Sequence, residues 1–314
     1  MDMKNTRKRK VNFMKKMLFV INPYAGMRKA SKVLAEILAV FNRAEYDVRV
    51  YVTAGQGDAI GAVERLSEGM DLVVCCGGDG TFNETITGLM SADRKVPVGY
   101  IPAGSTNDFA TSLRLSSDCV EAARQIVEGV PNAYDAGKFG GRYFSYVASF
   151  GAFTKASYST PQNVKNLLGH VAYLLEGMQE LSQIRKLHVK MILDGEEVLE
   201  DDYIFGAVCN STSVGGIMTL DPSQVDLTDG KFEVLLIRAP KTLQEIPECL
   251  LAVQKQQYNS AMMTFRTASR ITVEADPQMP WTLDGEKEEG HAEVQIRNLH
   301  KAIQIIQKKE NEDA

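Results

Sequence analysis

The sequence has no unbroken apolar run of the roughly 18 to 20 residues that a membrane-spanning helix needs. Its first residues, MDMKNTRKRKVNFMKK, carry seven basic side chains against one acid and lack the apolar core of a secretory signal peptide. We therefore expect a cytoplasmic protein. Residues 1–15 are interpreted either as a disordered, solvated tail or as a weak electrostatic tether to anionic lipid at the inner face of the membrane.

Cysteine and histidine are also scarce. The five cysteines form no C-x-x-C pair, and the four histidines lack the spacing of metal ligands, which excludes a zinc site and a disulfide framework. The formal net charge of −5 excludes a nucleic-acid binder held by overall basicity. What remains is a globular chain of 314 residues, 44% hydrophobic and 24% charged, long enough for about two domains.

The first part of the chain alternates between strand and helix patterns. Strands are predicted at 16–22, 47–53, 71–76 and 96–102, and helices at 29–43, 58–66 and 81–90. This alternation predicts an α/β domain over residues 16–133, in which helices cover both faces of a mostly parallel, doubly wound sheet.

The pattern changes near Tyr134, where strand-like runs separated by Asp-Gly turns take over. The runs lie at 142–150, 187–193, 202–210, 231–239, 270–275 and 291–296. They predict an antiparallel β-sandwich over residues 134–297 with helical insertions at about 161–183 and 242–257. Residues 298–314 are expected to return to the first domain and then fray.

Three glycine-containing turns follow strands of the α/β domain: NPYAG at 22–26, GGDGTFNE at 77–84 and IPAGSTNDFA at 101–110. Turns of this kind meet at the carboxyl edge of a parallel sheet, where bare backbone N–H groups attract phosphate. Neither the Walker A sequence nor the G-x-G-x-x-G fingerprint is present. Asp79, in the middle of the second turn, would repel phosphate unless a cation lay between them.

The three turns, in this order and spacing, resemble the catalytic domain of the diacylglycerol kinase family, and most closely its soluble bacterial lipid kinases. Sphingosine and ceramide kinases are more distant relatives, and GGDG motifs also occur in NAD kinases and phosphofructokinases. The resemblance extends from about Lys16 to about Gln307 and implies an NAD kinase-like fold, with ATP and Mg²⁺ as cofactors. Mg²⁺ would bridge Asp79 and the phosphates.

The resemblance implies a set of nucleotide-binding residues in the three turns and at the end of the second strand. They are Asn22, Pro23, Tyr24, Ala25, Gly26, Thr53, Gly77, Gly78, Asp79, Gly80, Thr81, Asn83, Glu84, Gly104, Ser105, Thr106, Asn107 and Asp108. Many relatives carry a lysine where this chain has Met27, so Arg28 and Lys29 are the candidates to replace it.

Two acidic stretches lie far downstream. TLDGEKEE at 282–289 contains Asp284 and Glu286, and the resemblance implies that Asp284 is the general base, with Glu286 as its alternate or a metal contact. VDLTDGKFEV at 225–234 matches a structural Mg²⁺ site, to which Asp226, Asp229 and Lys231 would contribute oxygens. Without the resemblance, each stretch is also compatible with a plain hairpin turn.

The segment 161–184 has an amphipathic pattern, which is compatible with packing against the sandwich or with a wall for acyl chains. We therefore predict an ATP-dependent lipid kinase that contacts the membrane surface, acts on diacylglycerol and forms phosphatidic acid. Relatives in the resembled family often pair, which makes a homodimer a candidate assembly. The alternatives are a kinase of another lipid, of NAD or of a sugar phosphate, and a non-catalytic nucleotide- or lipid-binding regulator.

Overall fold

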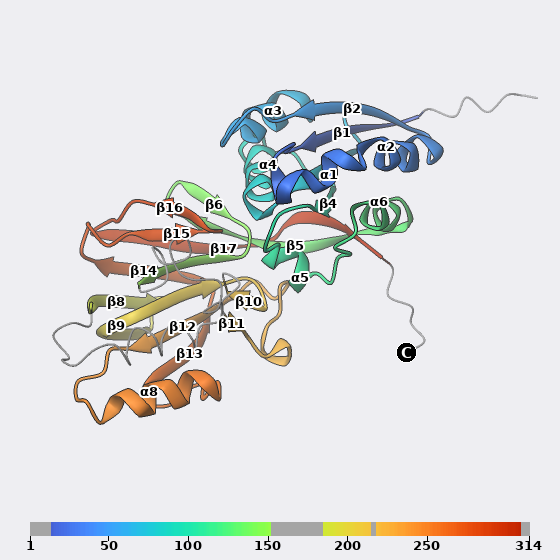
Figure 1. Cartoon of the computed structure of the whole chain (residues 1–314). Coiled ribbons are helices and arrows are strands. Elements are labelled where there is room, and N and C mark those ends of the chain that lie inside the picture. The colour runs from blue at the N-terminus through green and yellow to red at the C-terminus, as the bar shows by residue number, and fades with distance from the viewer. Residues whose placement is uncertain (1–13, 152–184, 215–217, 309–314) are drawn as a thin grey trace, which may run out of the picture.

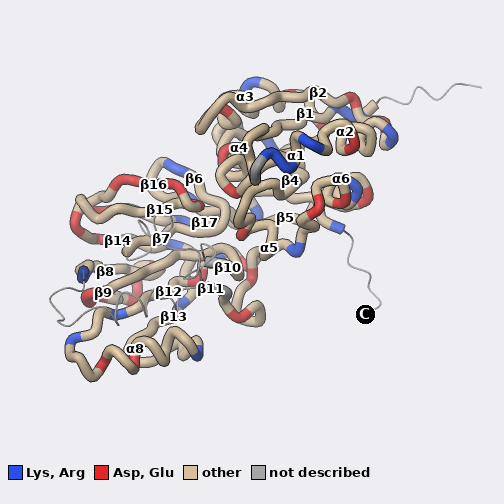
Figure 2. The backbone as a smooth tube through the Cα atoms, in the orientation of Figure 1, with Lys and Arg blue, Asp and Glu red and all other residues tan. Residues whose placement is uncertain are grey.

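A computed structural model describes residues 14–151, 185–214 and 218–308. The helical insertion predicted at 161–183 and most of the basic N-terminal stretch lie outside these residues. No helix of the described part is long and apolar enough to cross a membrane. Acidic and basic residues are interspersed over both domains (Figure 2).

The N-terminal part is the predicted α/β domain. Its four parallel strands, in the order β2-β1-β3-β4, are β1 (Lys15–Ile21), β2 (Tyr46–Val52), β3 (Leu72–Gly77) and β4 (Val98–Pro102). The helices are η1 (Ala25–Arg28), α1 (Lys29–Lys32), α2 (Leu34–Arg43), α3 (Asp58–Leu66), α4 (Asp79–Ser91), α5 (Asp108–Ser112) and α6 (Cys119–Glu128).

Alternate residues of β1 face opposite sides of this sheet, as the period of a strand requires. Phe19 packs with α2 and α6 on one face, and Val20 packs with α3 and α4 on the other. The helix expected over 29–43 is interrupted at Val33, which leaves the helical region at φ −116° and ends α1 before α2 begins. A β-branched residue is a weak helix former, so this break costs little.

The C-terminal part is an antiparallel sandwich. Its strands are β5 (Val130–Phe139), β6 (Arg142–Phe144), β7 (Val147–Gly151), β8 (Leu187–Leu193), β9 (Glu197–Cys209), β12 (Phe232–Arg238), β13 (Met263–Ala268), β14 (Arg270–Ala275), β15 (Trp281–Leu283), β16 (Glu286–Glu288) and β17 (Glu293–Gln307). A short pair, β10 (Ser213–Val214) and β11 (Met218–Thr219), and the 3-10 turn η4 (Pro222–Gln224) complete it. Helix α8 (Glu245–Gln254) lies at the end far from the N-terminal domain (Figure 1).

Large apolar side chains fill the sandwich. Trp281 is 1% exposed, and its ring centroid lies 4.9 Å from that of Phe139 and 4.9 Å from that of Phe150. Burying aromatic residues of this size contributes much of the driving force for folding. The predicted fold class, an α/β domain followed by a β-sandwich, is confirmed.

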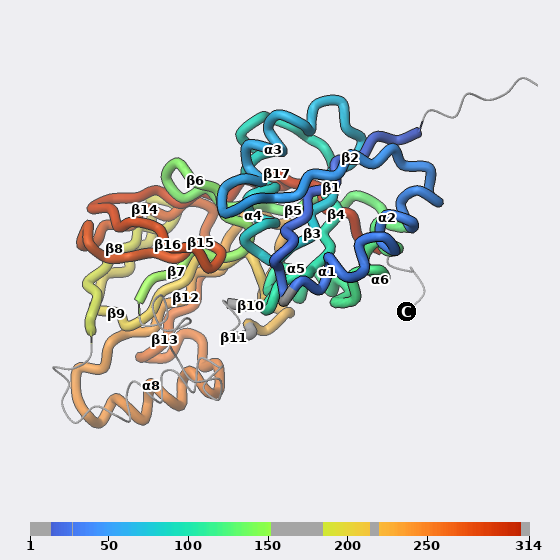
Figure 3. Tube along the Cα trace, turned by 45° about the horizontal axis from the view of Figure 1, so that its top comes forward, coloured from blue at the N-terminus to red at the C-terminus, as the bar shows by residue number. Residues whose placement is uncertain are grey.

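Two long strands that pair with each other, β5 and β17, connect the domains. β17 pairs with β14 and β5 along the sandwich, and near its end Ile305 pairs with Val98 of β4 in the parallel sheet. Figures 1 and 3 show this strand running from the sandwich to the N-terminal sheet. The N-terminal turns and the acids that follow β15 are thereby held in one fixed frame.

Candidate active site

The three glycine turns meet at the carboxyl edge of the parallel sheet, with their backbones in direct contact. A Cβ added to Gly104 would lie 2.6 Å from Gly78 Cα, and one added to Gly26 would lie 2.1 Å from the carbonyl oxygen of Ala103. Contacts this short leave no room for a side chain at either position. The predicted convergence of the turns is therefore present in the structure.

Asparagine side chains fix the conformation of the turns. The Asn22 amide donates to Thr81 Oγ1 at 3.3 Å, which connects the first turn to the second. In the third turn, Asn107 Oδ1 accepts from the N–H of Gly104 at 2.9 Å, and its amide donates back to the Gly104 carbonyl at 2.9 Å. Asn107 has a left-handed backbone, φ +54°, a conformation that asparagine tolerates better than most residues.

A cavity of about 370 Å³ lies over the turns at the N-terminus of α4. Gly78 precedes this helix and no side chain caps it, so the N–H groups of its first turn are available to an anion. The cavity brings together these predicted residues: Asn22, Tyr24, Ala25, Thr53, Gly78, Gly80, Thr81, Glu84, Gly104 and Glu286.

The other predicted residues of the turns do not line this cavity. Pro23, Gly26 and Gly77 belong to the turns but do not line it, and Ser105 and Thr106 are exposed. Asn83 lines a neighbouring cavity, and Asp108 is buried with its Oδ1 accepting from the hydroxyl of Ser213 at 2.6 Å.

Two acids of α4 hold the N-termini of other helices. Asp79 accepts from the backbone N–H groups of Asp108 at 3.0 Å and Phe109 at 3.3 Å, at the start of α5. Glu84 accepts from Gly57 at 2.7 Å and Ala59 at 3.1 Å, at the start of α3. These bonds fix the third turn and the loop after β2 against α4, a role that local sequence patterns did not indicate.

Burial raises the pKa of Asp79 to about 6, and the charges of Asp108 and Asp284 add to the shift against the backbone bonds that lower it. The charge of Asp284 thus acts on Asp79, although 205 positions separate the two residues in the chain. A pKa raised by burial and by nearby acids is typical of a functional cleft.

Asp284 is 4% exposed, and four N–H groups surround its carboxylate. Oδ2 accepts from the Asn83 amide at 2.6 Å and the Ser145 N–H at 2.5 Å. Oδ1 accepts from the N–H groups of Tyr146 and Val147, each at 3.0 Å. Burial raises the pKa of Asp284 to about 6, although these four donors favour the ionised form.

This arrangement explains why the strand predicted at 142–150 is divided into β6 and β7. Between them, the backbone at Ser145 and Tyr146 turns its N–H groups toward Asp284 instead of continuing the ladder. Asp284 itself has a left-handed backbone, φ +48°, in the turn from β15 to β16. Asp284 is thus both part of the Asp-Gly hairpin turn and a buried acid, so the two interpretations of this stretch are compatible.

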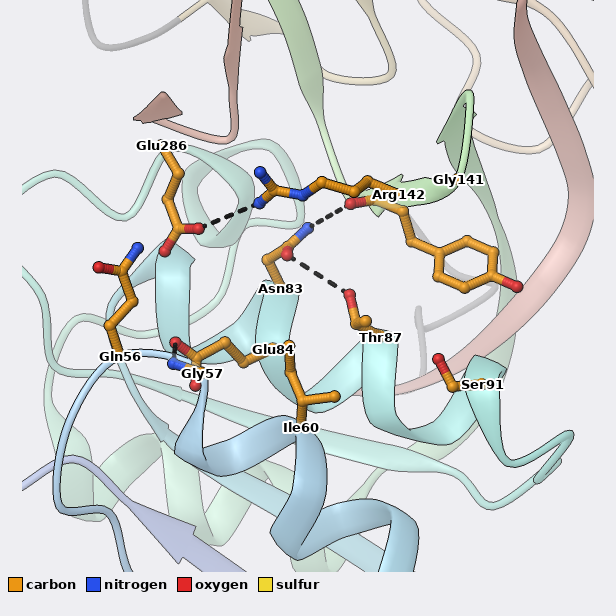
Figure 4. Close-up of a pocket in the computed structure, with 11 residues that line it drawn as sticks. Gln56, Gly57, Ile60, Asn83, Glu84, Thr87, Ser91, Gly141, Arg142 and Glu286 are labelled. Carbon is orange, nitrogen blue, oxygen red and sulfur yellow. Dashed lines mark hydrogen bonds and ion pairs between the residues drawn. The ribbon is translucent and has the colours of Figure 1, made fainter. Parts of the chain in front are cut away.

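Glu286 lies between two cavities. Its side chain is 24% exposed and lines both the cavity over the turns and a second cavity of about 430 Å³, which Asn83, Glu84 and Arg142 also line (Figure 4). Arg142, which the sequence did not single out, pairs with Glu286 at 3.3 Å and with Glu288 at 2.5 Å. A phosphoryl group where the cavities meet would lie beside Glu84 and Glu286.

The loop with Asp226, Asp229 and Lys231 lies elsewhere and lines neither cavity. Asp229 Oδ1 accepts from the Lys231 N–H at 2.8 Å, and Asp226 Oδ1 accepts from the Thr228 hydroxyl at 2.8 Å. The loop contacts the fully buried Asp135, which accepts from the Gly230 N–H at 2.6 Å and from the Lys301 N–H at 2.7 Å, and lies 3.1 Å from His300 Nδ1.

This loop has features that suit a hard cation. Two buried oxygens near it, Glu233 Oε2 and Asn298 Oδ1, have no hydrogen-bond donor within the described ranges. The Asn298 amide donates to the Lys231 carbonyl at 3.0 Å, and the charges of Asp226 and Asp229 act on Glu233. No group of three or more His, Cys, Asp or Glu in the described residues could hold a metal, so an ion here would depend mainly on carbonyl and amide oxygens.

Comparisons with known proteins agree with this architecture. Residues 16–139 match the model of the diacylglycerol kinase catalytic domain, and residues 147–307 match that of the YegS C-terminal NAD kinase beta sandwich-like domain. A diacylglycerol kinase from Bacillus subtilis strain 168 is 32% identical over 95% of this chain and 98% of its own length. A diacylglycerol kinase from Staphylococcus carnosus is 28% identical over 94% of this chain and 96% of its own length.

The fold also matches solved structures. A putative diacylglycerol kinase from Bacillus anthracis strain Sterne has a TM-score of 0.78 and 26% identity, covering 94% of this chain and 97% of that one. A second structure of a diacylglycerol kinase from the same organism has a TM-score of 0.74 and 25% identity, and the match covers 95% of this chain and 98% of that one.

Proposed function

Because this chain belongs to the diacylglycerol kinase family, we propose that it transfers the γ-phosphate of ATP to the hydroxyl of diacylglycerol and so forms phosphatidic acid. That the chain is a lipid kinase follows from its relatives. The observation that carries the proposal in the structure is the uncapped N-terminus of α4, which opens into a cavity facing Glu286.

The nucleotide would bind in the cavity of about 370 Å³. Its walls fit a triphosphate because glycine backbones form them, and the first-turn N–H groups of α4 would hold the phosphate oxygens. Mg²⁺, when bound with the nucleotide, would offset the charge of the phosphates and of the nearby acids. Glu286 is the acid with the most open path to that charge, because Asp79 and Glu84 already hold α5 and α3.

We propose that Asp284 is the general base that accepts the proton of the acceptor hydroxyl. Its four donors occupy about all the lone-pair positions of a carboxylate, so the hydroxyl would have to replace one of them. Asn83 is the only one of the four that donates from a side chain, and it lines the second cavity. The hydroxyl would therefore approach Asp284 from the side of Asn83, with Glu286 next to the path.

Transfer of labelled phosphate from ATP to diacylglycerol in mixed micelles tests the proposal. We expect label in the organic phase as phosphatidic acid, and more of it than with other lipid alcohols. A labelled product in the aqueous phase when NAD or a sugar phosphate is offered would instead show that the protein is a kinase of a soluble acceptor. ATP binding without transfer to any acceptor would favour a regulator.

We also propose that the loop from Asp226 to Lys231 holds a structural Mg²⁺, with Asp229 as its carboxylate ligand. Millimolar Mg²⁺ should then raise the melting temperature of the nucleotide-free protein, because an ion that binds only the folded state stabilises it. Asp229→Ala should remove most of this response.

Asp276→Ala is the matched control for Asp229→Ala. Asp276 Oδ1 accepts from the Gln278 N–H at 2.8 Å, the same turn bond at the same length as that between Asp229 and Lys231. This variant should lose the turn bond but keep the response to Mg²⁺. Equal responses of the two variants would remove Asp229 from the proposed site.

Peripheral contact with the membrane belongs to the same proposal, because the acceptor is a membrane lipid. Pairing of two copies stays a prediction, which light scattering of the purified protein would test.

A further inference from the structure

Three basic residues stand in a row across the outer face of the sandwich. In the strand register, Arg270 of β14 lies directly opposite Arg297 of β17, and Arg297 lies directly opposite Lys138 of β5. Like charges in directly opposed positions destabilise a sheet. The row therefore destabilises the folded sheet, and the packing of the fold does not explain why three like charges stand there.

The row faces solvent. Its neighbours along the strands, Ile271, Ile296 and Phe139, are at most 2% exposed and pack in the core of the sandwich. Because successive side chains of a strand point to opposite faces, Arg270, Arg297 and Lys138 point outward.

No carboxylate within the described residues pairs with this row. Arg297 donates to Gln295 Oε1, and Lys138 lies 5.4 Å from the centre of the Tyr143 ring. Asp194 Oδ1 accepts from the backbone N–H of Arg270 at 2.8 Å and not from its guanidinium.

Other basic side chains of the sandwich do have acidic partners. Lys190 pairs with Glu274 at 2.9 Å, and Arg266 pairs with Glu197 at 2.7 Å. The unpaired row is thus a local feature and not the general state of this surface.

A cavity of about 420 Å³ lies beside the row and is lined by Lys138 and Arg297, with His291 and one acid, Glu293. Gly141, in the turn between β5 and β6, lines both this cavity and the one that contains Glu286 and Arg142. The basic surface therefore adjoins the candidate active site, on the other side of one tight turn.

We propose that Lys138, Arg270 and Arg297 form a docking surface for the phosphate headgroups of anionic membrane phospholipids. The inference rests on the proposed function, because a kinase of a membrane lipid must meet its acceptor at a membrane surface. Phosphate oxygens would supply the charge that the row lacks, and arginine presents a planar fork that matches them. The turn at Gly141 would bring this contact next to the catalytic cleft.

Sedimentation with lipid vesicles tests the proposal without ATP or diacylglycerol, so its outcome is independent of catalysis. The unaltered protein should bind vesicles that mix phosphatidylglycerol with phosphatidylcholine, and should bind pure phosphatidylcholine vesicles much less. Arg270→Gln with Arg297→Gln should weaken partitioning about fivefold for each charge removed. Phosphate transfer by this double variant in detergent micelles, which lack anionic phospholipid, should be unchanged.

Lys190→Gln with Arg266→Gln is the matched control, since it removes the same charge from paired residues of the same domain. This control should keep most of the vesicle binding. The proposal is overturned if both double variants lose binding equally or if the protein binds both kinds of vesicle alike. Absence of transfer to diacylglycerol would instead count against the proposed function.

Discussion

Gly104→Ala should reduce ATP affinity and phosphate transfer by about a hundredfold, the scale expected when catalytic groups shift by about 1 Å. The added methyl group would lie 2.6 Å from Gly78 Cα and 2.7 Å from Asn107 Oδ1. Gly78 is backbone at the start of α4, so it can yield only by moving the N–H groups proposed to hold phosphate. Titration of the variant with a fluorescent ATP analogue measures the loss.

Gly55→Ala is the control for this prediction. Gly55 lines the same cavity, but a Cβ there would meet nothing within 4 Å. This variant should bind ATP normally. A melting curve of Gly104→Ala separates loss of the site from loss of the fold, since overpacking of this kind typically costs about 1–3 kcal/mol. A folded Gly104→Ala protein with normal ATP affinity would contradict the placement of the triphosphate.

Asp284→Asn should lower kcat by about 10²- to 10⁴-fold, the usual contribution of a general base. The substitution removes the ionisable group while keeping its size. It also places an amide NH₂ group among N–H donors that need acceptors, so the variant should melt at a lower temperature than the unaltered protein. A folded Asp284→Asn protein with full activity would reject the assigned base.

The pH dependence of the unaltered protein tests the same residue without a mutation. A base must be ionised to receive a proton, and the pKa of Asp284 is raised to about 6. kcat/KM should therefore rise as the pH increases through about 6 and level off above it. Because the pKa of Asp79 is also about 6 and Asp284 influences it, the measured value belongs to the pair.

Glu286→Gln serves as the comparison for Asp284→Asn. A glutamine can still accept the bond from Arg142, so the turn after β15 should stay in place. We expect a smaller loss of kcat than with Asp284→Asn, and a rise of activity near pH 6 that persists. The reverse order of effects would make Glu286 the proton acceptor.

The sequence predicted the parts of the site that depend on local pattern. Glycine between an apolar strand and a helix indicates a candidate phosphate-binding turn, and the three turns do converge. The sequence did not indicate which helices the acids near these turns contact. Asp79 contacts α5, and Glu84 contacts α3, about 30 and 25 positions away in the chain. Such bonds depend on the packing of the sheet, which a local pattern does not contain.

The same limit explains the missed elements. β17 begins near the predicted run at 291–296 but extends to Gln307, because β5 pairs with it between Ile296 and Gln307 and β4 pairs with it at Ile305. Arg142 gave no signal, since its acidic partners Glu286 and Glu288 lie more than 140 positions away. The predicted fold class was correct because the periods of strands and helices are local, whereas ion pairs between distant strands are not.

The central claim is that acids and glycine turns from distant parts of the chain form one pocket for the end of a triphosphate. A crystal structure with Mg²⁺ and a non-hydrolysable ATP analogue tests it most directly. The account predicts that the β- and γ-phosphates lie against the N–H groups of Gly80 and Thr81, with the γ-phosphate facing Glu286. A triphosphate bound in the basic cavity beside Lys138 and Arg297, or on the outer side of α4, would contradict it.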